Sequence, residues 1–98
     1  MNKVYILGLF FSNLFASQLL FDIDQNKYQN QTIFKNHSSN ILIMNLNSQI
    51  YKLKQNSSIG FKCRTDFTLD PTIFSDDQSN YYSRSFDCGK VITLKDEL

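Results

Sequence analysis

The chain has 98 residues, with ten Lys plus Arg against nine Asp plus Glu and a formal net charge of +1. This length predicts one small domain, near the size at which an apolar core alone stabilises a fold only marginally. A near-zero charge without blocks of like sign argues against nucleic-acid binding and against attraction to an anionic membrane surface. The body is nearly free of Ala and Glu and rich in Asn, Ser, Ile, Phe and Tyr, which favours strands and loops over helices.

The first residues follow the order of a secretory signal peptide. Lys3 gives a short basic start, residues 4–11 form an apolar run, and residues 12–17 bring small and polar side chains. The apolar run is shorter than the roughly 20 residues needed to cross a bilayer, so a membrane anchor is the weaker alternative. We expect residues 1–16 to be removed and residues 17–94 to form the domain, with no membrane span in the mature chain.

Seven short apolar or alternating segments predict strands along the body. They cover residues 19–23, 28–34, 41–46, 49–54, 59–63, 81–86 and 91–94, and residues 65–69 either continue the fifth or form a strand of their own. Clusters of Asn, Ser, Gln and Asp predict turns or loops at 36–40, 55–58 and 75–80, and a reversal of the chain at 45–48. Asp70-Pro71 ends a strand, because proline cannot donate to a ladder. This spacing of strands and turns predicts an all-β fold, a small antiparallel sandwich or barrel.

Cys63 and Cys88 are the only cysteines. In an oxidising compartment an even count predicts one disulfide. Closing a loop of this length stabilises the fold by about 3.5 kcal/mol on the chain-entropy model. The alternative is a reactive pair in a thiol-active factor, although lumenal thiol oxidoreductases usually space their cysteines two residues apart. A free thiol or an intermolecular bridge is the remaining possibility.

Three triplets match the acceptor pattern for N-glycosylation, at Asn30, Asn36 and Asn56. Asn56 lies in the clearest turn cluster and is the first choice. Asn36 also falls in a turn cluster, whereas Asn30 falls in a predicted strand. We expect at least one glycan, and unmodified polar surface is the alternative.

No arrangement of residues predicts catalysis, a metal site or a cofactor. His37 is the only histidine and lies in a polar cluster, without a second metal-ligating side chain nearby. Asp76-Asp77 lacks the alternating oxygen ligands of a calcium loop. Asp66 with Asp70, or Asp76 with Asp77, could be paired carboxylates for glycoside hydrolysis. Nothing in the sequence fixes the distance between them, so charged side chains in solvated loops are the favoured interpretation.

Tyr81, Tyr82, Arg84 and Phe86 form the one cluster that could recognise a partner, since Tyr and Arg are favoured at interfaces. Ordinary cross-strand packing, with one ring buried and one exposed, is the favoured alternative.

The final residues, Lys95, Asp96, Glu97 and Leu98, match the tetrapeptide that a lumenal receptor uses to return proteins to the endoplasmic reticulum. Together with the expected signal peptide, this tail predicts a soluble resident of the reticulum lumen. We expect a non-enzymatic domain whose partners are the retrieval receptor and another lumenal protein. Two alternatives stay open: a small secreted protein or gene fragment with a coincidental tail, and a thiol-active lumenal factor using the two cysteines.

Overall fold

The computed structural model describes residues 19–77 and 81–96, and these residues form ten β-strands and no helix. The strands are β1 (Leu19–Gln25), β2 (Gln31–His37), β3 (Leu42–Leu46), β4 (Gln49–Leu53), β5 (Ser58–Lys62), β6 (Thr68–Leu69), β7 (Thr72–Ser75), β8 (Tyr81–Ser83), β9 (Phe86–Asp87) and β10 (Lys90–Asp96). The all-β prediction is confirmed. The expected signal peptide, residues 1–16, and the tail residues Glu97 and Leu98 lie outside the described residues. In the described ranges, no helix is long and apolar enough to cross a membrane.

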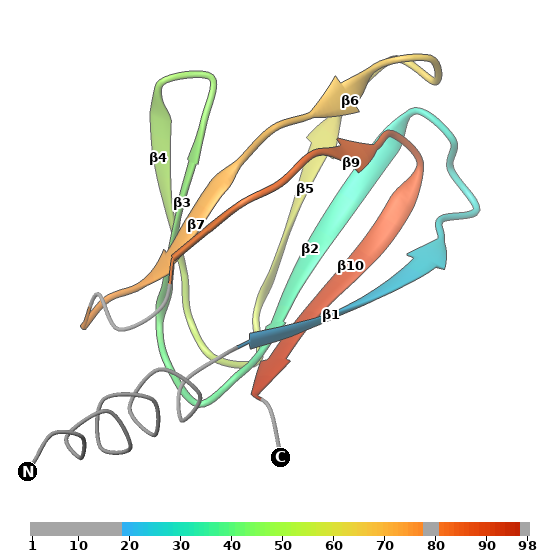
Figure 1. Cartoon of the computed structure of the whole chain (residues 1–98). Helices are drawn as coiled ribbons and strands as arrows, with labels where there is room; N and C mark the ends of the chain where they lie inside the picture. The colour runs from blue at the N-terminus through green and yellow to red at the C-terminus, as the bar shows by residue number, and fades with distance from the viewer. Residues whose placement is uncertain (1–18, 78–80, 97–98) are drawn as a thin grey trace, which may run out of the picture.

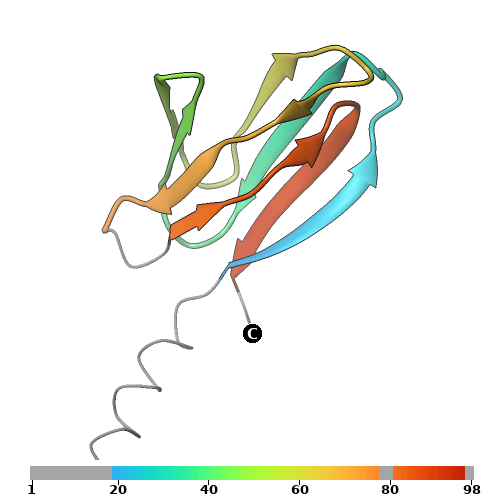
Figure 2. The ribbon, with the colours of Figure 1, turned by 45° about the horizontal axis from the view of Figure 1, so that its top comes forward.

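Two four-stranded sheets face each other (Figures 1 and 2). We name sheet A the sheet with strand order β1-β10-β2-β5, and sheet B the sheet with order β4-β3-β7-β8. Neighbouring strands are antiparallel except β10 and β2, which run parallel at the centre of sheet A. A short third sheet pairs β6 with β9.

The inner faces of both sheets supply the core. Alternate residues of β2, β3, β7 and β10 are buried, as expected for strands with one face covered. The largest fully buried apolar side chains are those of Phe34, Ile92 and Leu94 from sheet A and of Leu42, Met44 and Ile73 from sheet B. Phe34 also makes edge contacts with the rings of Phe61 and Phe86, at 5.9 and 5.5 Å between centroids. These contacts extend the core toward β5 and β9.

A single long hairpin crosses from the third sheet into sheet B. Thr68 lies opposite Asp87 in the β6–β9 ladder, and Thr72 lies opposite Ser83 in the β7–β8 ladder, so both ladders share one register. Pro71 lies between the two ladders, where a residue without a backbone N–H is tolerated. Strand β6 ends at Leu69, just before Asp70-Pro71, as predicted, but β7, which starts at Thr72, was not predicted.

The hairpin of β3 and β4 has a two-residue turn at Asn47 and Ser48. Both residues have positive φ, at 53° and 66°, and the flanking Leu46 and Gln49 are paired. This is the signature of a type I′ turn, whose twist matches that of the strands it joins.

The side chains of Cys63 and Cys88 form a disulfide, with Cα atoms 5.9 Å apart, within the usual range. Cys63 follows β5 and Cys88 follows β9, so the bridge ties an edge of sheet A to the segment that enters β10. The predicted pairing is confirmed in the folded chain.

Candidate functional site

The first half of the expected retrieval tail belongs to a strand. Lys95 pairs with Leu20 of β1 and with His37 of β2, and Asp96 pairs with Leu19. The ammonium group of Lys95 lies 2.6 Å from a carboxylate oxygen of Asp22. The last predicted strand, residues 91–94, therefore extends two residues further than expected.

A second contact holds the same end of β10. The backbone N–H of Ser39 donates to a carboxylate oxygen of Asp96 over 2.8 Å. Asp96 is thus bound through its side chain as well as through the ladder. Both described tail residues are part of the folded domain.

Three residues of the expected recognition cluster, Tyr82, Arg84 and Phe86, pack around Phe21. Phe86 is 3% exposed and belongs to the core. The ring of Tyr82 makes an edge contact with Phe21, 5.2 Å between centroids, and its hydroxyl accepts a hydrogen bond from the backbone N–H of Leu19. The guanidinium of Arg84 lies over the rings of Phe21 and Phe86, at 5.6 and 5.3 Å. These contacts correspond to cross-strand packing, and the side chain of Tyr81 is outside the described residues.

The three acceptor asparagines lie in different surroundings. Asn56 is exposed, with φ 61°, in the turn between β4 and β5. Asn30 is exposed in the turn before β2, although a strand was predicted there. Asn36 is inside β2 and fully buried, so the turn predicted at this residue is wrong.

The amide of Asn36 is saturated with hydrogen bonds. Its nitrogen donates to the carbonyl oxygens of Asn40 and Leu53, each over 2.9 Å. Its oxygen accepts from the N–H and the hydroxyl of Ser38, over 2.9 and 2.6 Å. A buried amide with both N–H groups engaged has no room for a glycan.

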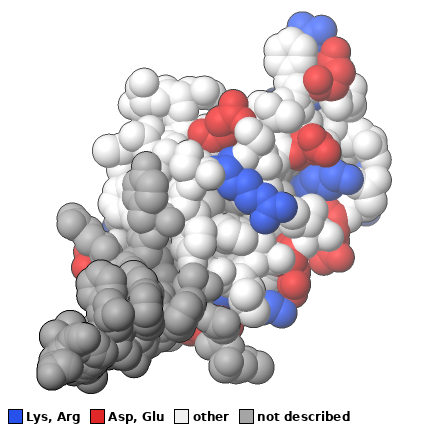
Figure 3. Space-filling model, in the orientation of Figure 1, with Lys and Arg blue, Asp and Glu red and all other residues white. Residues whose placement is uncertain are grey.

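Metal-ligating side chains do not gather into a metal site in the described part of the chain. No three His, Cys, Asp or Glu residues there lie close enough to hold a metal ion. His37 is the exposed last residue of β2, not part of a loop. Asp70 accepts a hydrogen bond from the hydroxyl of Ser85. On the face shown in Figure 3, charges of both signs are scattered.

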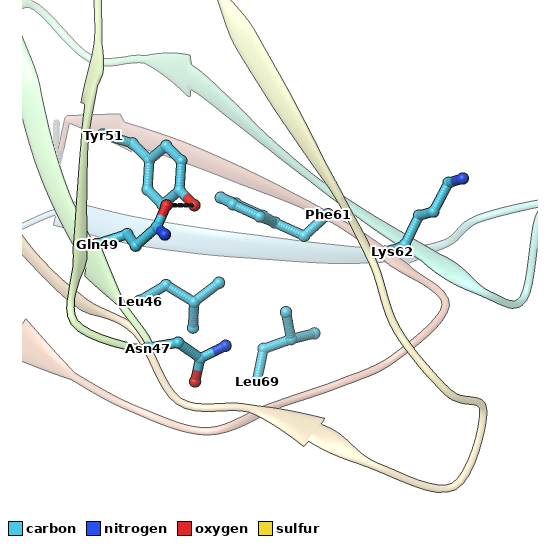
Figure 4. A pocket seen from close by; sticks show the side chains of 7 residues that line it. All are labelled: Leu46, Asn47, Gln49, Tyr51, Phe61, Lys62 and Leu69. Atoms are coloured by element: carbon cyan, nitrogen blue, oxygen red, sulfur yellow. Dashed lines mark hydrogen bonds between the residues drawn. The ribbon is translucent and has the colours of Figure 1, made fainter.

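A groove lies between the β3–β4 hairpin and the β5–β6 segment (Figure 4). Its first part is a cavity of about 240 Å³. Apolar lining comes from Leu46, Phe61 and Leu69, and polar lining from Asn47, Gln49, Tyr51 and Lys62. A second hollow shares Leu46, Asn47, Lys62 and Leu69 with the first and extends to Arg64, Phe67 and Asp70. We call the two together the hairpin groove.

Aromatic contacts fix the walls of the hairpin groove. The rings of Tyr51 on β4 and Phe61 on β5 meet edge to face, 5.0 Å between centroids. The Tyr51 hydroxyl donates to the side-chain oxygen of Gln49 over 3.1 Å. Figure 4 shows Lys62 directed away from these rings, so its charge lies at the rim. Arg64 lies 4.7 Å over the ring of Phe67, which is 54% exposed.

The groove is bordered by two strands with an unpaired edge. β4 pairs only with β3, and β5 pairs only with β2. Each strand therefore presents unpaired backbone N–H and C=O groups to whatever occupies the space between them. An apolar floor, a polar rim and free strand edges are suited to holding an extended peptide.

No family model matches this chain, and neither a curated protein nor a solved structure matches it. The hairpin groove was not predicted from sequence, because its residues come from three separate segments, 46–51, 61–64 and 67–70, that only the fold brings together. The turn residues Asn47 and Ser48 were the one local indication, since they mark the hairpin that forms one wall.

Proposed function

We propose that this chain is a lumenal protein of the endoplasmic reticulum whose role is to bind another protein through the hairpin groove. The observation that carries the binding role is the groove itself, bounded by the free edges of β4 and β5. Strand addition to such an edge gains affinity from backbone hydrogen bonds and specificity from alternate side chains. In this proposal an apolar side chain of the partner occupies the space between Leu46, Phe61 and Leu69.

The disulfide and the final tetrapeptide support the proposed compartment. Disulfides form and persist in oxidising compartments such as the reticulum lumen. The tetrapeptide is an address for a receptor in the same pathway. For the receptor to bind all four residues, Lys95 and Asp96 must leave their partners on β1 and β2, at least briefly.

Residence is tested by following the chain in a eukaryotic cell and scoring secretion and glycan trimming. The matched variant carries two extra residues, Gly and Ser, after Leu98, which moves the terminal carboxylate without changing β10. We expect the unmodified chain to stay inside with immature glycans and the extended chain to be secreted. Equal secretion of both would refute residence through the tail.

Binding is tested by placing a photo-crosslinking amino acid at Gln49, on the groove rim, or at Lys27, an exposed residue in the turn before β2. We expect a discrete crosslinked protein from position 49 and none from position 27. The double variant Leu46→Ala with Tyr51→Ala should weaken the product while the chain stays folded by circular dichroism. The same products from both positions would contradict a role for the groove.

One observation favours a second candidate, a secreted protein. Lys95 and Asp96 are paired in β10 and engaged by Asp22 and Ser39, which opposes their capture by a receptor. In that case the unmodified chain is secreted, and its partner is extracellular.

A further inference from the structure

The two edges of sheet A carry opposite charges. On β1 the exposed side chains of Asp22 and Asp24 point to the outer face, because Leu19 and Phe21 pack inward. On β5 the exposed Lys62 points outward, because Ile59 and Phe61 pack inward. Asp22 forms an ion pair with Lys95, whereas Asp24 and Lys62 have no ion-pair partner among the described residues.

These two edges also run in the same direction. β1 is antiparallel to β10, β10 is parallel to β2, and β2 is antiparallel to β5. A second copy, shifted sideways by the width of the sheet, therefore places its β1 beside β5 of the first copy in parallel orientation. The inner faces of the two copies then lie on the same side.

The free backbone groups are arranged for this pairing. Asn26 donates to Gly89, so the even-numbered residues of β1 bond to β10 and the odd-numbered ones face outward. Cys63 donates to Asn30 and Asn36 donates to Ser57, so odd-numbered residues of β5 bond to β2. Gly60 and Lys62 therefore present their N–H and C=O groups at the free edge.

One register uses these groups and pairs the charges. In a parallel ladder, a residue bonds to the two neighbours of the residue beside it. With Ile23 beside Phe61, the peptide groups of Ile23 meet those of Gly60 and Lys62. The side chain of Asp24 then lies beside that of Lys62 on the outer face. Ile23, now 42% exposed, becomes covered on the inner face.

The direction of the two edge strands, the alternation of their free backbone groups and their opposite charges all fit one contact. We propose that copies of this chain associate head to tail, with β1 of one copy pairing in parallel with β5 of the next. Two identical edges repel each other. Pairing β1 with β1 would bring carboxylates together, and pairing β5 with β5 would bring ammonium groups together. The contact is heterologous, so it extends into a filament or closes into a ring. The contact uses the free edge of β5, which also borders the hairpin groove, so a partner strand added to β5 and a second copy of the chain exclude each other. The proposal does not depend on the proposed compartment.

The test is sedimentation velocity of the purified, disulfide-bonded chain over a range of concentrations at low and high ionic strength. We expect species larger than one chain at low salt, dissociating as salt screens the charges. The variants Asp24→Lys and Lys62→Glu should each associate about tenfold more weakly or not at all, because each opposes like charges. An equal mixture of the two should associate again, since each then presents an edge complementary to the other.

Matched controls change exposed charges away from both edges. Asp87→Lys on β9 and Lys54→Glu after β4 should leave association unchanged. Circular dichroism and an intact disulfide check that every variant is folded. A monomer at all concentrations at low salt overturns the proposal. Association that Asp24→Lys and Lys62→Glu leave intact also overturns it, as does a mixture that stays monomeric.

Discussion

The ammonium nitrogen of Lys95 lies 2.6 Å from a carboxylate oxygen of Asp22, which ties the last described strand to the first. This pair connects a residue of the expected retrieval tail to the folded domain. Any receptor that binds Lys95 has to compete with Asp22 and with the backbone ladder between β1 and β10. In the proposed function, retention in the reticulum therefore depends on the fold as well as on the tetrapeptide.

Replacing Asp22 with Asn should lower the free energy of unfolding by about 0.2–1 kcal/mol, because both partners of the ion pair are partly exposed and screened by solvent. Urea denaturation measures the change. Asp66→Asn is the matched control and should have no effect, since Asp66 is exposed and has no ion-pair partner among the described residues. Equal effects of the two substitutions would show that the ion pair does not contribute.

The double variant Cys63→Ser with Cys88→Ser should lose about 2–4 kcal/mol of stability, because the bridge restricts the unfolded chain. Chemical denaturation of both forms checks this. In the native protein, alkylation without reductant should label neither cysteine. Cys88 is only 6% exposed, which protects the bridge from exchange. Rapid labelling in a glutathione buffer would instead support the thiol-active alternative.

Glycan mapping by mass spectrometry should find occupancy at Asn56 or Asn30 and none at Asn36 in folded protein. The first two are exposed in turns, whereas the amide of Asn36 is buried and bonded to Asn40, Leu53 and Ser38. Asn36→Ala should destabilise the domain by about 1–3 kcal/mol, because it leaves buried partners unsatisfied. A folded, secreted form with a glycan on Asn36 would contradict the observed network.

Ser48→Gly should raise the free energy of unfolding by about 0.5–1 kcal/mol. Ser48 has φ 66°, a conformation that glycine adopts without steric cost and that type I′ turns favour. Ser83→Gly in β8 is the control and should destabilise, because glycine weakens a strand. Thermal melts of both variants show whether each substitution raises or lowers stability. A loss of stability in Ser48→Gly would exclude a type I′ turn.

Local patterns predicted most of the fold. The alternation of Ile59, Phe61 and Cys63 marked β5, and the apolar run before Leu46 marked β3, because one-sided burial imposes a period of two. β7 was missed because Pro71 indicates a strand end. Its missing N–H falls in the gap between two ladders of the same hairpin, and the register continues past it.

The surroundings of Asn36 and the hairpin groove depend on contacts that no local pattern contains. Asn36 sits in a polar cluster typical of a turn, yet the carbonyl of Leu53 on β4 satisfies its amide inside a strand. The groove requires knowledge of which edges of the two sheets stay unpaired. That follows from strand order, which in turn depends on pairings such as Leu19 with Asp96 at opposite ends of the described chain.

The position of β10 has a consequence for synthesis. It is the last described strand in the chain, yet it lies between β1 and β2 in sheet A. Sheet A therefore cannot close while β10 is still inside the ribosome. In the proposed compartment, the earlier strands enter the lumen before they can complete this sheet. If the chain enters the lumen as proposed, Asn36 is open to the glycosyltransferase during that interval. A chain modified there could no longer bury this residue, so the timing between translation and folding sets the fraction of molecules that reach the native state.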